Sequence, residues 1–146
     1  MIEQHIYIKQ YKWDITVLYN VGKEHLDKVF NILVDICDNE KHLKEAINHL
    51  LENKINTGFI YSNLYNRTSL ITIGKVNSAE EFIDTVVHEA NHLQSHIATY
   101  YDLDEKGEEV CYVIGDIVKQ MYSIFKKIIC YLFGISVFKI YICIIL

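Results

Sequence analysis

The order of sequence patterns along this 146-residue chain predicts an α+β domain. Apolar and polar residues alternate in the first segment, and apolar residues recur at helical spacing in the second. A further strand-rich segment then precedes two long helical segments. Separate runs of strands and helices are typical of α+β folds. A hydrophobic content of 51% in a chain of this length indicates one domain with its own core.

Four short runs rich in β-branched and aromatic residues supply the predicted strands. The first two are Ile6 to Ile8 and Trp13 to Tyr19. Phe59 to Tyr61 and Ser69 to Ile73 flank a cluster of turn residues, which predicts a hairpin. We therefore expect a short antiparallel sheet.

Helical spacing of apolar residues predicts the first pair of helices. The pattern runs from Lys23 to Asn53, and the Asp38-Asn39 pair near its middle is expected to divide it into two helices.

A capping box marks the start of the next helix. Ser78 can accept a hydrogen bond from a free backbone N–H, and Glu81 can bond back to the cap, so this helix should begin at Ala79. The stretch YYDLDEKGEE ends it, and a last helix is expected from about Glu105 to Lys127.

The domain is predicted to span residues 1–127, and a hydrophobic tail follows at residues 128–146. As a helix, at about 1.5 Å per residue, this tail is about long enough to cross a bilayer. Lys139 near its middle would cost roughly 2.5–3.5 kcal/mol there. The composition also suits a buried strand or an interface helix, so both a membrane anchor and a packed segment stay open.

Charge and cysteine content limit the classes of function. A formal net charge of -5 argues against nucleic-acid binding, which needs clustered Lys and Arg. The four cysteines show no CxxC spacing, and no secretory signal precedes the first strand. These features predict a cytoplasmic protein, or one associated with a membrane through its tail.

The candidate functional site is the H-E-x-x-H motif that begins at His88 and ends at His92. On a helix, positions i and i+4 share a face, so both imidazoles can bind one zinc ion. Three protein ligands leave an open position for water, and Glu89 can take the proton of that water. This chemistry suits peptide-bond hydrolysis. The alternative is a helix that carries two surface histidines beside a glutamate.

The motif HEANH, followed after a turn by a helix that opens GEEVCYVIGD, resembles the gluzincin metallopeptidases. The closest likeness is to small bacterial and bacteriophage members that hold only the catalytic core. The resemblance covers about residues 57–122 and implies a zincin-like domain. It further implies that His88 and His92 bind zinc, that Glu89 is the general base, and that Glu108 or Glu109 is the third ligand. Gluzincins usually carry an aspartate four residues after that glutamate, and Tyr112 or Val113 stands there instead.

Helical geometry favours Glu108 over Glu109 as this ligand. Glu109 shares a face with Asp116 and other polar residues, whereas Glu108 lies on a mostly uncharged stripe where Gly115 would permit close approach of another helix. A carboxylate on such a stripe needs a partner, and a metal provides one. The predicted zinc ligands are therefore His88, His92 and Glu108.

Other residues near the motif have weaker assignments. Tyr100, Tyr101 and Tyr112 are candidates to stabilise the oxyanion only because they are close in sequence. His96 continues the i, i+4 series. A metzincin, however, would need its third histidine six residues after His92. His96 is therefore expected on the polar face of the helix, or in contact with the metal ligands without binding the metal itself. The remaining histidines, His5, His25, His42 and His49, are expected at the surface.

The predicted function is a zinc-dependent peptidase that acts on a peptide or protein. The strand Ser69 to Ile73 could pair with an extended substrate if it forms the edge of the sheet, but not if it is an inner strand. Two other functions stay open. One is a non-catalytic zinc-binding interaction module, which would not need the carboxylate of Glu89. The other is a membrane-associated structural protein.

Overall fold

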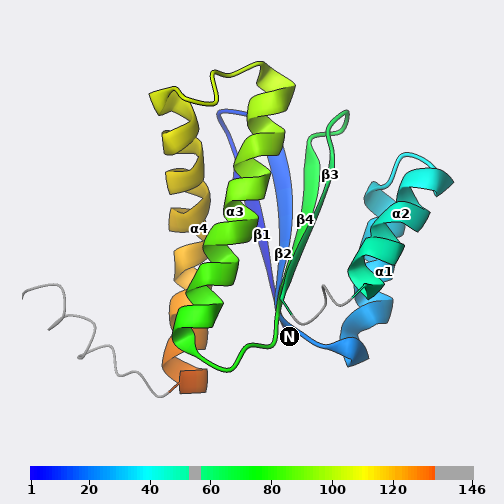
Figure 1. Ribbon diagram of the computed structural model, residues 1–146, viewed down its shortest axis with the longest axis vertical. Helices are drawn as coiled ribbons and strands as arrows, with labels where there is room; N and C mark the ends of the chain where they lie inside the picture. The colour runs from blue at the N-terminus through cyan, green and yellow to red at the C-terminus, as the bar shows by residue number, and fades with distance from the viewer. Residues whose placement is uncertain (53–56, 134–146) are drawn as a thin grey trace, which may run out of the picture.

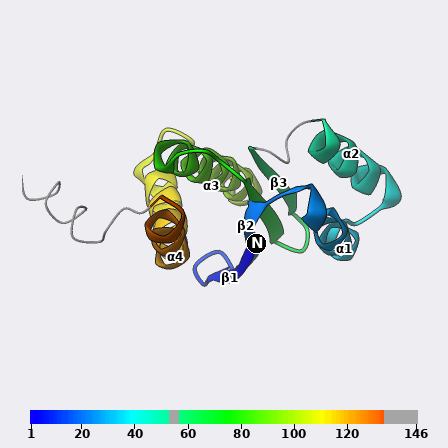
Figure 2. The same cartoon turned by 90° about the horizontal axis from the view of Figure 1, so that it is seen from below.

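The computed structural model describes residues 1–52 and 57–133, which form a four-stranded sheet with helices on both faces (Figures 1 and 2). The elements in chain order are β1 (Ile2–Ile8), β2 (Trp13–Val21), a 3-10 turn (Lys23–His25), α1 (Leu26–Ile36), α2 (Glu40–Leu51), β3 (Gly58–Asn63), β4 (Thr68–Gly74), α3 (Ala79–Tyr101) and α4 (Glu108–Phe133). The predicted α+β class is confirmed.

The sheet is mixed, so the prediction of an antiparallel sheet is wrong. Its strand order is β1-β2-β4-β3, in which β1 pairs with β2 and β3 pairs with β4 in antiparallel fashion. The two central strands, β2 and β4, are parallel. A parallel pair needs a long connection, and α1, α2 and β3 supply one between these two strands.

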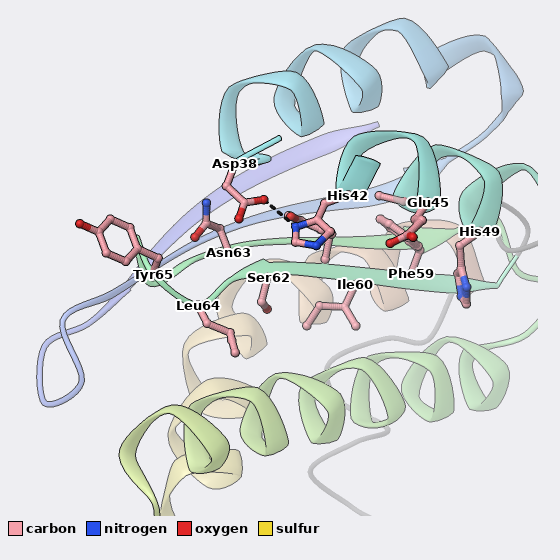
Figure 3. Close-up of a pocket in the computed structure, with 12 residues that line it drawn as sticks. Asp38, His42, Glu45, His49, Phe59, Ile60, Ser62, Asn63, Leu64 and Tyr65 are labelled. Carbon is pink, nitrogen blue, oxygen red and sulfur yellow. Dashed lines mark hydrogen bonds and ion pairs between the residues drawn. The ribbon is translucent and has the colours of Figure 1, made fainter. Parts of the chain in front are cut away.

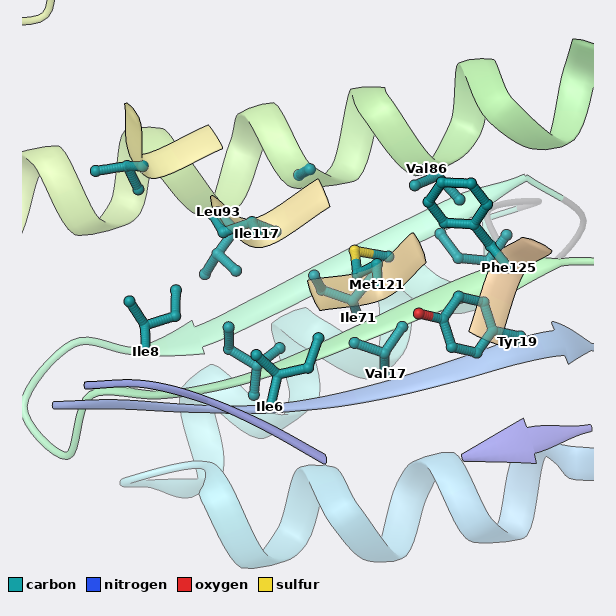
Figure 4. Close-up of a cluster of buried hydrophobic side chains, with 14 of the residues drawn as sticks. Ile6, Ile8, Val17, Tyr19, Ile71, Val86, Leu93, Ile117, Met121 and Phe125 are labelled. Carbon is teal, nitrogen blue, oxygen red and sulfur yellow. The ribbon is translucent and has the colours of Figure 1, made fainter. Parts of the chain in front are cut away.

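Two hydrophobic clusters lie on opposite faces of the sheet. The larger one packs the inward side chains of β1, β2 and β4 against α3 and α4, as Figure 4 shows. On β2, Val17 belongs to this cluster, while its neighbour Leu18 belongs to the smaller cluster beneath α1 and α2. Side chains alternate between the faces of a strand, so burial of both faces makes β2 the centre of the fold.

Helix α3 begins where the sequence predicts. Ser78 Oγ accepts a hydrogen bond from the Glu81 backbone N–H at 3.1 Å, as expected of the cap. The Glu81 carboxylate accepts from the backbone N–H of Asn77 at 2.9 Å, one residue before the cap. The helix ends at Tyr101, where Asp102 takes a left-handed conformation with φ 52°.

Helix α4 begins and ends later than the sequence predicts. A turn delays its start, because the Asp104 backbone carbonyl accepts from Gly107 N–H and the Asp104 side chain accepts from Lys106 N–H. At the other end α4 continues to Phe133, and Ile128 and Ile129 are buried in the larger cluster. The helix therefore crosses the expected boundary after residue 127.

The prediction of a tail anchor falls mostly on residues 134–146, which lie outside the described residues. Within residues 1–52 and 57–133, no helix combines the length and the apolar character needed to cross a membrane.

Candidate metal centre

Helix α3 contacts β3, the edge strand of the sheet, and its histidines His88 and His92 are exposed beside that strand. His88, His92 and His96 recur at every fourth position, so they share one face of the helix. Between this face and β3 is a cavity of about 310 Å³, lined by His49, Gly58, Phe59, Ile60, His88, Glu89, His92 and His96. The H-E-x-x-H motif thus opens onto a cavity instead of pointing only to solvent.

The two motif histidines converge on one point. Nε2 of His92 lies 3.1 Å from Nε2 of His88, and their ring centroids are 4.6 Å apart. Two nitrogens at about 2.0–2.1 Å from a tetrahedral zinc ion lie about 3.3 Å from one another. The pair therefore fits two positions of a zinc site with little rearrangement.

Glu89 is buried behind the histidine pair, with only 4% of its surface exposed. It lines the same cavity, and its side chain lies against the backbone of β3 at Gly58. A Cβ atom at Gly58 would lie 2.3 Å from Oε1 of Glu89, which is closer than any real contact. Gly58 is therefore the residue that leaves room for this carboxylate.

His96 is half-buried one turn beyond His92. Its Nδ1 lies 2.7 Å from the hydroxyl of Ser62 on β3. Burial lowers the pKa of His96, and the nearby His92 lowers it further, so the neutral imidazole is favoured. The expectation that His96 supports the site is compatible with this position, although Ser62 is a partner that the sequence did not reveal.

His49 also lines the cavity, which the sequence did not predict. It comes from α2, and its ring lies 5.9 Å from that of Phe59 on β3. A second cavity of about 570 Å³ shares His49, Phe59 and Ile60 with the first and continues along β3 beneath α2 (Figure 3). Together the two cavities form a groove along the outer edge of the sheet.

Glu108 is not brought to the histidine pair. It is exposed at the first turn of α4, which runs antiparallel to α3, and it does not line the cavity. Helix α3 ends at Tyr101, about 13 Å along its axis beyond His92, and Figure 1 shows that α4 starts near this end of α3. Gly115, which was expected to meet another helix, has no neighbour within 4 Å of an added Cβ.

The adjacent Glu109 has a structural partner. Its Oε1 accepts a hydrogen bond from the hydroxyl of Tyr11 at 2.9 Å. Burial and this carboxylate raise the pKa of Tyr11 to about 12. Glu109 therefore joins α4 to the loop after β1, instead of facing only solvent as its polar neighbours indicated.

The three tyrosines considered for the oxyanion do not line the cavity either. The Tyr100 hydroxyl accepts from Arg67 at 2.9 Å, and the Tyr101 hydroxyl donates to the Tyr11 carbonyl at 2.5 Å. Tyr112 is 71% exposed on the outer side of α4. None of them points to the histidine pair.

Among residues 1–52 and 57–133, no group of three or more His, Cys, Asp or Glu side chains is arranged to hold a metal ion. The site therefore offers two converging imidazoles and a buried carboxylate. Comparisons with protein-family models, with curated proteins and with solved structures find no match. The proposal that follows rests on the geometry of this chain and on the motif.

Proposed function

We propose that this protein is a zinc-dependent peptidase whose active site is the cavity between α3 and β3. The convergence of His88 and His92 beside the buried carboxylate of Glu89 carries this proposal. A zinc ion held by the two imidazoles would lower the pKa of a water molecule toward neutrality and polarise a peptide carbonyl. His88 and His92 hold the metal in this proposal. The resemblance to gluzincins implies Glu108 as a third ligand, but the position of Glu108 outside the cavity does not support that role.

Glu89 acts as the general base in this proposal. Its carboxylate takes a proton from the attacking water and gives it to the nitrogen of the leaving amine. Its burial in the wall of the cavity keeps this carboxylate away from bulk water. Gly58 fixes its position by admitting the side chain against β3.

The substrate is proposed to be an extended peptide that pairs with β3. Strand β4, which holds Ser69–Ile73, lies between β2 and β3 and has no free edge. In the described part of the chain, β3 pairs with β4 alone, and its outer edge borders the groove that leads to the histidine pair. An extended peptide can satisfy the backbone groups of such an edge.

Metal analysis of the purified full-length protein tests the proposal most directly. The wild-type chain should bind zinc stoichiometrically, and His92→Ala should bind little, while circular dichroism shows the same helix content for both. A wild-type chain that takes up no zinc under these conditions would refute the site.

The same protein preparation separates an enzyme from a non-catalytic zinc module. Zinc-loaded wild type should hydrolyse fluorescein-labelled casein, and Glu89→Gln should bind zinc without hydrolysis. Zinc binding with no hydrolysis by the wild type would favour the non-catalytic module.

A further inference from the structure

A chain of hydrogen bonds runs from the core to His96. The indole Nε1 of Trp13 donates to Ser69 Oγ at 2.8 Å, Ser69 Oγ lies 2.7 Å from Ser62 Oγ, and Ser62 Oγ lies 2.7 Å from His96 Nδ1. Trp13 is fully buried, Ser69 is 1% exposed, and the chain crosses from β2 through β4 and β3 to α3.

The Trp13 N–H at the buried end determines the direction of donation along this series of hydrogen bonds. An indole N–H can only donate, so Ser69 Oγ is the acceptor at that contact. The Ser69 hydroxyl hydrogen then needs an acceptor, and Ser62 Oγ is the one beside it. Ser62 can in turn donate its hydrogen to Nδ1 of His96, and in that arrangement each hydroxyl donates once and accepts once.

The reverse direction is less favourable. If His96 Nδ1–H donated to Ser62 and Ser62 donated to Ser69, the Ser69 oxygen would accept twice. Its own hydrogen would then have no acceptor among the hydrogen bonds of the described residues, at a cost of about 1–3 kcal/mol for a buried donor.

If Ser62 donates in this way, the tautomer of His96 is defined. An Nδ1 that accepts a hydrogen bond belongs to a neutral imidazole with its proton on Nε2. Such a ring offers an N–H donor at Nε2 and cannot bind a metal through that atom. His96 lines the same cavity as His88 and His92 and lies one helical turn from His92, so its ring is a neighbour of the proposed metal position.

We propose that His96 is the residue that stabilises the oxyanion, and that Trp13, Ser69 and Ser62 are positioning residues that hold it as the Nε2–H tautomer. This assignment rests on the proposed peptidase function. When the water oxygen bonds to the carbonyl carbon, an electron pair moves onto the carbonyl oxygen, which accepts a hydrogen bond from His96 Nε2–H. The pair returns as the C–N bond breaks, and Glu89 gives the proton taken from water to the amine nitrogen.

Side-chain ¹H–¹⁵N NMR of the metal-free protein tests the tautomer without any substrate. His96 should be the Nε2–H form in the wild type, and Ser62→Ala should give a mixture of both tautomers. Ser95→Ala is the matched control, because that hydroxyl, next to His96, donates only to the helix carbonyl of Asn91. An Nδ1–H form in the wild type would overturn the proposal.

Zinc titration and casein hydrolysis then separate a hydrogen-bond donor from a metal ligand. His96→Ala should retain the zinc affinity of the wild type while kcat falls by about 10²-fold, as for loss of one oxyanion donor. His96→Gln places an amide N–H near the Nε2 position and should recover part of kcat, whereas His96→Asn reaches only the Nδ1 position and should not. Loss of zinc binding in His96→Ala, or full activity of that variant, would overturn the assignment.

These outcomes distinguish failure of the inference from failure of the proposed function. A wild-type chain that binds no zinc refutes the peptidase itself. A wild-type chain that binds zinc and hydrolyses casein, together with an equally active His96→Ala, refutes only the role of His96.

Discussion

Helices α2 and α3 both carry histidines along the groove at β3, but they hold them in different ways. On α2, His42 Nδ1 lies 2.7 Å from Asp38 Oδ1 at the start of the helix, and both side chains are nearly half exposed. On α3, His88 and His92 face one another at 3.1 Å, next to a carboxylate that is 4% exposed.

The difference lies in spacing and burial, because each of the two regions places an acid near a histidine. His42 and His49 are seven residues apart, which separates them by about 10 Å along the axis, too far to share a metal ion. The four-residue spacing on α3 brings two rings together, and packing against β3 removes the intervening acid from water. An acid beside a histidine thus forms an exposed hydrogen bond at the start of α2, whereas on α3 it is buried and is a candidate base.

Loss of one α3 histidine should have the largest effect. We expect His88→Ala to weaken zinc binding by about 10³-fold, since apparent binding energies of about 10–16 kcal/mol at structural zinc sites are shared among a few ligands. His42→Ala, the matched change on α2, should leave zinc affinity unchanged in a competition titration with a chromophoric chelator. Equal losses in the two variants would mean that the spacing on α3 has no special role.

Removal of the charge of Glu89 should separate chemistry from metal binding. Glu89→Gln keeps the shape of the side chain but cannot accept a proton, so casein hydrolysis should fall by about 10²- to 10³-fold while zinc affinity is retained. On α2, Glu45→Gln changes an exposed acid that lies 3.9 Å from Lys41, and turnover should not change. Retained turnover in Glu89→Gln would remove this residue as the base.

Much of the α3 side could be predicted from the sequence because its signals are local. The cap at Ser78, the start of the helix and the placement of His88 and His92 on one face depend on residues within a few turns of one another. The confirmed strand pairs β1–β2 and β3–β4 also join neighbouring segments of the chain.

The remaining features depend on contacts between distant segments. The parallel pairing of β2 with β4 is decided by how α1 and α2 pack, so strand patterns alone did not reveal it. His49 reaches the cavity only because α2 lies beside β3. The only sequence signal for the hydrogen-bonded side chains was one serine just after the first predicted strand of the hairpin and one at the start of the second. The sequence argument for Glu108 used only its angular position around the helix axis. That angle gives the direction in which a side chain points, but it does not give how far along α3 the residue lies.

Gly58 tests whether the close approach of β3 to α3 matters for activity. Gly58→Ala should displace the Glu89 carboxylate, since an added Cβ would overlap with Oε1, Cδ and Cγ. Misplacement by 1 Å can cost about 10²-fold in rate, so we expect turnover to fall by up to about 10²-fold with zinc affinity retained. Gly22→Ala is the control, because its Cβ would meet only the exposed side chain of Glu24, which can move away. Equal turnover in both variants would show that Glu89 does not depend on this contact.

The smallest effect is expected at Glu108, and the adjacent Glu109 provides the contrast. Glu108 is exposed and outside the cavity, so Glu108→Ala should change zinc affinity by no more than about twofold, as for an ordinary surface substitution. Glu109→Ala removes the acceptor of the Tyr11 hydroxyl, which should lower the free energy of unfolding by about 1–3 kcal/mol in urea denaturation without altering zinc affinity. A loss of zinc affinity by orders of magnitude in Glu108→Ala alone would mean that α4 shifts along α3 by two turns when metal binds. In that case the third ligand would be the one that the gluzincin resemblance implies, and the arrangement of α3 and α4 described above would be that of the metal-free protein.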